Sequence, residues 1–93
     1  MSRKLLSTRR TVAEAVSRYM SAWNALRTYV EEQGAHAWLF QADDNPHIYM
    51  EFIEWKPGTG NHLLDDQQLI VLRRALDQFG PSTDDLWTQP KAE

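Results

Sequence analysis

The chain has 93 residues, a net charge of −3, a hydrophobic content of 42% and no cysteine. This length and composition predict one folded domain over residues 1–93, and they exclude a disordered chain, a disulfide framework and a zinc site built on thiolates. The acidic balance also argues against nucleic acid as a partner, because phosphate binding depends chiefly on lysine and arginine.

No apolar run approaches about 18 residues, and the basic start of the sequence lacks the continuous apolar segment of an export signal. We therefore expect no membrane partner and a cytoplasmic location. The absence of cysteine is compatible with that reducing compartment.

The first predicted element is a strand over Lys4–Arg10, with the sequence KLLSTRR. A helix beginning near the N-terminus is the alternative, but the helix-start signal at Thr11 favours a strand before it. Because side chains alternate across a strand, we expect Leu6 and Thr8 on one face of the sheet and Leu5 on the other.

A long helix is predicted next, over Thr11–Gln33. Thr11 is followed three residues later by Glu14, the capping-box spacing in which each side chain satisfies a backbone N–H at the helix start. Gly34 favours the positive φ that commonly ends a helix. Alternating steps of four and three place one apolar stripe against the sheet, formed by Val12, Val16, Tyr19, Trp23, Leu26 and Val30.

Two further strands, Ala35–Gln41 and Ile48–Trp55, flank an Asp-Asp-Asn-Pro sequence typical of a turn, which predicts a β-hairpin. If Gln41 lies opposite Ile48, alternation places on one face Ala35, Ala37, Leu39, Ile48, Met50 and Phe52. The other face then carries His36, Trp38, Phe40, Tyr49, Glu51, Ile53 and Trp55. Both faces are largely apolar, so we expect helices to cover the small-residue face and a second copy of the chain to cover the aromatic face.

The last predicted elements are a helix over Asp65–Phe79 and a C-terminal segment. Asp65 and Gln68 repeat the capping spacing, and a Gly-Pro pair ends the helix. The apolar stripe of this helix consists of Leu69, Leu72, Leu76 and Phe79. Residues 82–93 are polar apart from a Leu-Trp pair, so we expect either a weak edge strand or an arm that reaches across to a partner.

The element order predicts an α+β fold, a ferredoxin-like antiparallel sheet (split βαβ) with both helices on one face and strand order 4-1-3-2. This arrangement leaves the aromatic face uncovered. A monomer rarely exposes so large an apolar area, which favours a homodimer.

The helix ending in Gly34, the stretch GAHAWLFQ, the Asp/Asn-Pro turn and the stretch IYMEFIEW resemble the dimeric α+β-barrel proteins, a group that includes antibiotic-biosynthesis-monooxygenase-like domains. The resemblance covers roughly Lys4 to Phe79 and implies a homodimer with a cavity between sheet and helices or between two sheets. Activities in this group include cofactor-free oxygenation, haem degradation and isomerisation. Asn24 and Trp23 are adjacent and do not match the Asn-Trp-His set of haem-degrading members, so we expect no cofactor.

His36 and Glu51 are the candidate catalytic residues, because they share a face and lie on neighbouring strands in the expected register. A His–carboxylate pair of this kind can transfer protons. The alternative is a structural role at the interface, with Glu51 paired to Arg9 or Arg10 of the first strand, since a buried charge without a partner is costly. Glu54 could take the same arginine.

The candidate ligand-binding residues are Trp23, Trp38, Phe40, Tyr49 and Trp55, for which packing in the core or at the interface is the alternative. No metal site is expected, since the spacing of His36, His47 and His62 matches no metal-binding motif. An aromatic sheet face also serves RNA-recognition domains, but two glutamates on the IYMEFIEW strand would repel phosphate.

We therefore expect a homodimer that binds a small apolar or aromatic molecule in a cavity at the sheet. One alternative is a structural or interaction homodimer without a ligand. The other is a cofactor-independent monooxygenase-like enzyme. The sequence names no substrate and leaves open whether the protein is an enzyme.

Overall fold

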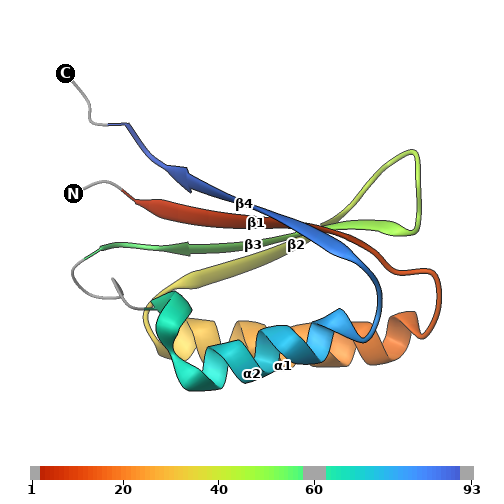
Figure 1. Ribbon diagram of the computed structural model, residues 1–93, viewed down its shortest axis with the longest axis horizontal. Helices are drawn as coiled ribbons and strands as arrows, with labels where there is room; N and C mark the ends of the chain where they lie inside the picture. The colour runs from red at the N-terminus through yellow and green to blue at the C-terminus, as the bar shows by residue number, and fades with distance from the viewer. Residues whose placement is uncertain (1–2, 58–62, 91–93) are drawn as a thin grey trace.

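The structure, a computed structural model, describes residues 3–57 and 63–90. Its elements are β1 (Lys4–Thr11), α1 (Val16–Glu32), β2 (His36–Gln41), β3 (Ile48–Trp55), the short 3-10 helix η1 (Leu63–Asp65), α2 (Gln67–Asp77) and β4 (Ser82–Thr88). The strands form one antiparallel sheet in the order β2-β3-β1-β4, and both helices lie on the same face of it (Figure 1). The predicted ferredoxin-like topology is therefore confirmed, including its strand order.

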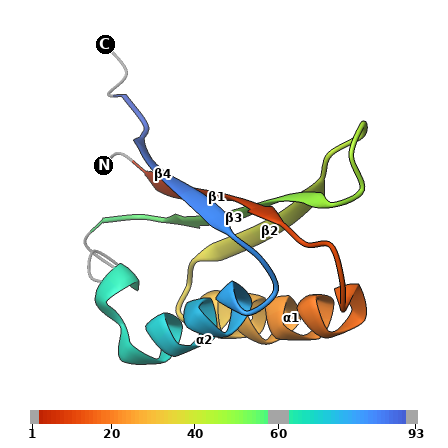
Figure 2. The same ribbon diagram turned by 45° about the vertical axis from the view of Figure 1, so that its right-hand side comes forward.

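Figure 2 shows α1 and α2 side by side in one layer beneath the sheet. The core between the two layers includes Leu6, Tyr19, Trp23, Leu26, Val30, Ile53, Leu69 and Leu76, each at most 5% exposed. Burying a large apolar side chain stabilises a fold by about 1.5–3 kcal/mol, so the two helical stripes hold the helices against the sheet. No helix among the described residues combines the length and the apolar character needed to cross a bilayer.

The first helix begins later than predicted. β1 extends to Thr11, whose backbone N–H donates to the carbonyl oxygen of Pro81 at 3.1 Å. α1 starts only at Val16, after Ala15, which has a left-handed backbone (φ 58°) and makes no side-chain cap. The expected capping box of Thr11 and Glu14 is wrong because Thr11 belongs to β1 and its backbone is hydrogen-bonded there.

The hairpin register differs by one residue from the expected one. Gln41 pairs with Tyr49, and the N–H of Ala42 donates to the carbonyl oxygen of Ile48 at 2.9 Å, which extends the pairing toward the turn. A shift of one residue moves every side chain of a strand to the other face. The helices therefore cover Tyr49, Glu51, Ile53 and Trp55, the reverse of the prediction. The open face of the sheet, which the helices do not cover, carries Met50, Phe52 and Glu54. His36, Trp38 and Phe40 also lie on this face, as predicted.

α2 is capped one residue later than predicted. The N-cap is Asp66 and not Asp65, and the carboxylate of Asp66 accepts a hydrogen bond from the N–H of Leu69 at 3.0 Å. The hydroxyl of Tyr29 on α1 donates to the same carboxylate at 2.8 Å. The hydrogen bond from Tyr29, together with that from Leu69, holds the pKa of Asp66 below its ordinary value. One side chain thus caps α2 and joins the two helices.

The C-terminal segment is a strand. β4 pairs antiparallel with β1, and all seven of its residues are exposed. Ser82–Thr88, within the segment expected to be either a weak edge strand or an arm, thus lies at the edge of the sheet. Residues 91–93 and residues 58–62, which include His62, lie outside the described part of the chain.

The turn between α2 and β4 requires glycine at position 80. Gly80 has a φ of +156°, and a Cβ built there would overlap the carbonyl oxygen of Thr11. We expect Gly80→Ala to lower the free energy of unfolding by about 2–3 kcal/mol, measured by urea denaturation. Gly34 is the matched control, because it ends α1 at a φ of +82° with nothing within 4 Å of its Cβ position. Gly34→Ala should cost only about 1 kcal/mol of backbone strain, and equal losses at both positions would contradict the steric argument.

Candidate functional site

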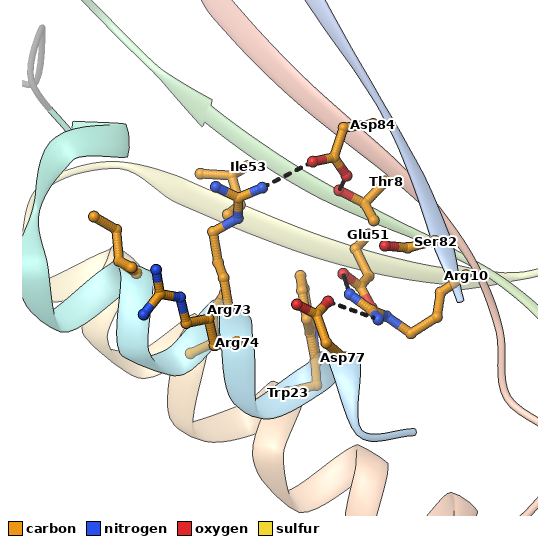
Figure 3. Close-up of a pocket in the computed structure, with 12 residues that line it drawn as sticks. Thr8, Arg10, Trp23, Glu51, Ile53, Arg73, Arg74, Asp77, Ser82 and Asp84 are labelled. Atoms are coloured by element: carbon orange, nitrogen blue, oxygen red, sulfur yellow. Dashed lines mark hydrogen bonds and ion pairs between the residues drawn. The ribbon is translucent and has the colours of Figure 1, made fainter. Parts of the chain in front are cut away.

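A pocket of about 240 Å³ opens between α2 and the helix-facing side of β1, β3 and β4 (Figure 3). Its apolar lining consists of Trp23, Leu26, Ile53 and Ile70. Its polar lining consists of Thr8, Arg10, Glu51, Arg73, Arg74, Asp77, Ser82 and Asp84. Small-molecule sites combine these two kinds of surface, the apolar part for burial and the polar part for orientation.

The deepest polar group of the pocket is the ion pair of Arg10 on β1 and Glu51 on β3. The Nε of Arg10 donates to Oε2 of Glu51 at 2.7 Å, and the two side chains are only 3% and 6% exposed. Tyr19 on α1 donates its hydroxyl to the same oxygen at 2.7 Å. A buried charge pair is tolerated only where its remaining polar atoms are satisfied. Among the described residues, no buried side-chain nitrogen or oxygen lacks a partner.

Arg10 also holds the end of α2. Its Nη1 donates to Oδ1 of Asp77 at 3.2 Å and to the carbonyl oxygen of Gly80 at 2.9 Å. Burial alone would lower the pKa of Arg10, but the hydrogen bonds and charges of Glu51 and Asp77 outweigh burial and raise that pKa. The guanidinium therefore stays charged and links the sheet to the last turn of α2 at one side of the pocket.

Tyr19 acts as a hydrogen-bond donor in this cluster. Burial, reinforced by the hydrogen bond to Glu51, raises the pKa of Tyr19 above its ordinary value. Its ring lies 5.2 Å from that of Tyr49 and 5.8 Å from that of Phe79, measured between centroids. The hydroxyl therefore remains protonated at neutral pH and cannot serve there as a general base.

A second ion pair crosses the mouth of the pocket. Nη2 of Arg73 on α2 lies 3.0 Å from Oδ2 of Asp84 on β4, and Thr8 donates its hydroxyl to Oδ1 of Asp84 at 2.8 Å (Figure 3). The side chains of Arg73 and Asp84 are 30% and 46% exposed. A pair this exposed contributes at most about 1 kcal/mol, so it can be broken at little cost.

The two candidate catalytic residues lie on opposite faces of the sheet. Glu51 faces the helices, whereas His36 lies on the open face, opposite Glu54 in the strand pairing. The predicted pair of His36 and Glu51 is wrong because it depended on the register that differs by one residue. The alternative pairing of Glu51 with Arg10 is confirmed, but it lies in the core beneath the sheet and not at an interface. Glu54 instead pairs with Arg3 at 2.9 Å.

The five candidate ligand-binding residues are divided between the two faces. Trp23 lines the pocket, and Tyr49 and Trp55 are 6% and 7% exposed in the core on the helix side. Trp38 and Phe40 are 42% and 59% exposed on the open face. The structure therefore does not bring these five aromatic residues together in one site.

The sequence does not single out the pocket residues Arg73, Asp77 and Asp84. Arg73 and Asp77 are four residues apart on α2, a spacing usual for charges on a solvated helix surface. They meet the sheet only because the end of α2 passes beneath the start of β4 (Figure 2). The sequence feature that could have predicted part of the site is Glu51, a carboxylate within an apolar strand. A buried carboxylate requires a basic partner, and here that partner is Arg10.

The open face of the sheet carries a cluster of exposed aromatic side chains. Phe40 packs edge-on against Phe52 with ring centroids 5.7 Å apart. On the other side of the sheet centre, Trp87 is 54% exposed and donates its Nε1 to the hydroxyl of Ser7 at 2.8 Å. Exposed aromatic side chains therefore lie on this face at both β2 and β4, together with polar residues that include His36 and Glu54.

Metal-binding side chains do not cluster in the part of the chain that the structure describes. Within residues 3–57 and 63–90, no three His, Asp or Glu side chains are placed to hold a metal ion. His36 lies on β2 and His47 in the hairpin turn, and neither lines the pocket.

The fold is shared with several solved structures. SnoaB, a cofactor-independent oxygenase from Streptomyces nogalater, matches with a TM-score of 0.80 at 17% identity, over 99% of this chain and 97% of SnoaB. A conserved protein from Methanosarcina mazei matches with a TM-score of 0.82 at 16% identity, over 97% and 95% of the two chains. An antibiotic biosynthesis monooxygenase matches with a TM-score of 0.74 at 11% identity, over 98% and 99%. No protein-family model and no curated protein sequence matches the chain. These likenesses confirm the expected resemblance to antibiotic-biosynthesis-monooxygenase-like structures at the level of the fold.

Proposed function

We propose that this chain, which shares its fold with a cofactor-independent oxygenase and an antibiotic biosynthesis monooxygenase, is a homodimeric protein that binds a small aromatic molecule beneath its sheet. The observation that carries the proposal is the pocket itself, which has Trp23 in its apolar lining and charged groups opposite. Its volume of about 240 Å³ is below the roughly 300–1,000 Å³ of sites for drug-sized ligands. A ligand of one or two rings fits this volume.

The polar wall of the pocket supports binding because it is already ordered. Arg10 is held by two carboxylates and a backbone carbonyl, so its position does not depend on a ligand. A site whose side chains are ordered in advance loses less conformational entropy when a ligand binds. The conformational cost of binding is then limited to the exposed mouth, at Arg73 and Asp84.

Filling the pocket tests the proposal. Ile70 is half-buried on α2 and lines the pocket, whereas the neighbouring Val71 is 58% exposed and does not. We expect the parent protein to bind 2-naphthamide, a neutral two-ring probe, and Ile70→Trp to weaken this binding at least about tenfold in isothermal titration calorimetry. Val71→Trp adds the same side chain outside the pocket and should leave the affinity unchanged. The pocket is not the site if the parent does not bind, or if both variants lose affinity equally.

The open face supports the homodimer. Trp38, Phe40 and Trp87 are exposed there, and an apolar patch of this extent usually marks an interaction surface. A two-fold pairing would cover the patch on each copy with the same patch of the other. Because the pocket opens on the opposite side of the sheet, this pairing leaves both pocket mouths accessible.

Trp38→Glu is expected to convert the dimer into a folded monomer. The charge would lie opposite Phe52 on the open face, where it stays solvated in the monomer but is buried in the dimer. Light scattering at micromolar concentration should show a dimer for the parent, whose interface buries more than about 1,200 Å². Arg27→Glu, on the exposed side of α1, should remain dimeric. A well-folded parent monomer at this concentration would rule out the dimer.

Cofactor-independent oxygenation, the activity of SnoaB, is the second candidate function, and the shared fold favours it. The buried groups that could move a proton are engaged, since Glu51 accepts from both Arg10 and Tyr19. Oxygenation would therefore depend on the reactivity of the bound substrate more than on these residues. Oxygen uptake with 1,4-dihydroxynaphthalene that Ile70→Trp abolishes would support an oxygenase, and uptake equal to the protein-free rate would favour binding alone.

A further inference from the structure

We infer that the ligand of this pocket is an aromatic acid, whose anionic group displaces Asp84 from Arg73. The inference rests on the proposed function, because it specifies the chemistry of the molecule bound in the same pocket. It follows from which polar groups of the lining are already bonded and which are not.

The carboxylates of the pocket are engaged. Glu51 accepts hydrogen bonds from Arg10 and Tyr19, Asp84 from Thr8 and Arg73, and Asp77 from Arg10. Among the carboxylates of the described lining, only Oδ2 of Asp77 accepts no hydrogen bond from a described residue, and the side chain of Asp77 is 63% exposed to solvent. A cationic ligand would therefore find no free buried carboxylate in the described lining.

The guanidinium donors at the mouth are not all engaged. A guanidinium carries five N–H donors, and Arg73 uses one of them, on Nη2, toward Asp84. Arg74 also lines the pocket and makes no hydrogen bond or ion pair with any residue that the structure describes. The lining thus has several unused guanidinium N–H donors, against one unengaged and solvent-exposed carboxylate oxygen of Asp77, which favours an anionic group on the ligand.

Arg73 is placed to change partners. Its side chain extends from α2 across the pocket mouth to Asp84 on β4 (Figure 3). A ligand carboxylate can bind a guanidinium through two parallel hydrogen bonds, which is stronger than the single exposed contact it would replace. Asp84 would keep the hydroxyl of Thr8 as its donor after the exchange, so it would not lose all of its partners. The aromatic part of the ligand would then lie toward Trp23 and Ile53.

Two probes that differ in charge test the inference, namely 2-naphthoate and the neutral 2-naphthamide, titrated calorimetrically at pH 7. We expect the parent to bind the acid about tenfold more tightly than the amide. Arg73→Gln should remove this preference, so that the acid and the amide bind the variant with about equal affinity. Asp84→Asn should instead raise the affinity for the acid several-fold, because it removes the carboxylate that competes for Arg73.

The controls separate a local effect from a change in net charge or fold. Arg27→Gln removes one positive charge from the exposed side of α1, where Arg27 lies 3.9 Å from Glu31, and should leave the preference intact. The melting temperatures of the Arg73 and Asp84 variants should stay close to that of the parent, since their ion pair is exposed.

The outcomes distinguish this inference from the proposed function. If the amide binds but the acid is not preferred, or if Asp84→Asn weakens binding of the acid, the acid ligand is wrong and the pocket proposal stands. Tighter binding of 2-naphthylmethylammonium than of either probe would also overturn the inference. If no probe binds the parent, both the pocket proposal and the acid ligand fail.

Discussion

Arg10→Met is expected to lower the free energy of unfolding by about 3–5 kcal/mol, because it leaves the charge of Glu51 buried without its cation. Glu51 is 5% exposed, and the hydroxyl of Tyr19 would be the donor that remains to it among the described side chains. The change also removes the donor to Asp77 and to the carbonyl oxygen of Gly80 at the end of α2. Urea denaturation followed by tryptophan fluorescence measures the loss.

A rescue variant separates the uncompensated charge from the loss of packing. In Arg10→Met/Tyr19→Phe/Glu51→Met, all three polar groups are replaced by apolar groups of similar size, and such replacements are often neutral or stabilising. We expect this triple variant to be at least about 2 kcal/mol more stable than Arg10→Met alone. Arg27→Met, which breaks an exposed pair, should change the stability by less than about 0.5 kcal/mol. A triple variant no more stable than the single one would show that Arg10 acts through its contacts with α2.

The topology could be predicted from the sequence because each element carries a local signal. The apolar stripe of α1, from Tyr19 to Val30, and the turn residues of the hairpin both act within a few residues of the chain. Right-handed crossovers then leave few ways to connect the strands. The same locality explains the misplaced helix start. A capping signal is present at Thr11, but the backbone N–H of Thr11 instead donates to the carbonyl oxygen of Pro81, which lies near the far end of the chain.

The hairpin register could not be predicted because both faces of β3 are largely apolar. Met50 and Phe52 on one face are as suited to a core as Ile53 and Trp55 on the other. The residue that distinguishes the two faces is Glu51, whose carboxylate can be buried in the core only when its hydrogen-bond partners are present. Those partners are 41 and 32 residues away along the chain, on β1 and α1. The predicted catalytic pair was wrong for the same reason, because it depended on this register. No local sequence pattern predicted the pocket that α2 and β4 line.

Leu26→Asp is expected to unfold the protein, whereas Phe52→Asp should leave it folded. Leu26 is 1% exposed between α1 and the sheet, so the new carboxylate would be buried without a partner, at a cost above about 3 kcal/mol. Phe52 is half-buried on the open face, beside Phe40, where a carboxylate can reach water in the monomer. Circular dichroism and thermal melting measure both variants.

Both substitutions should be compared in the Trp38→Glu background, because the stability of a dimer depends on protein concentration. In that background, Phe52→Asp should lower the melting temperature by only a few degrees, while Leu26→Asp should show no cooperative transition. In the parent background, Phe52→Asp should also break the dimer, since Phe52 lies opposite Trp38 in the strand pairing. If Phe52→Asp unfolded the monomer as fully as Leu26→Asp, the helices would have to cover the Phe52 face. The faces of β3 would then be reversed, and Arg10 and Glu51 would no longer meet beneath the sheet.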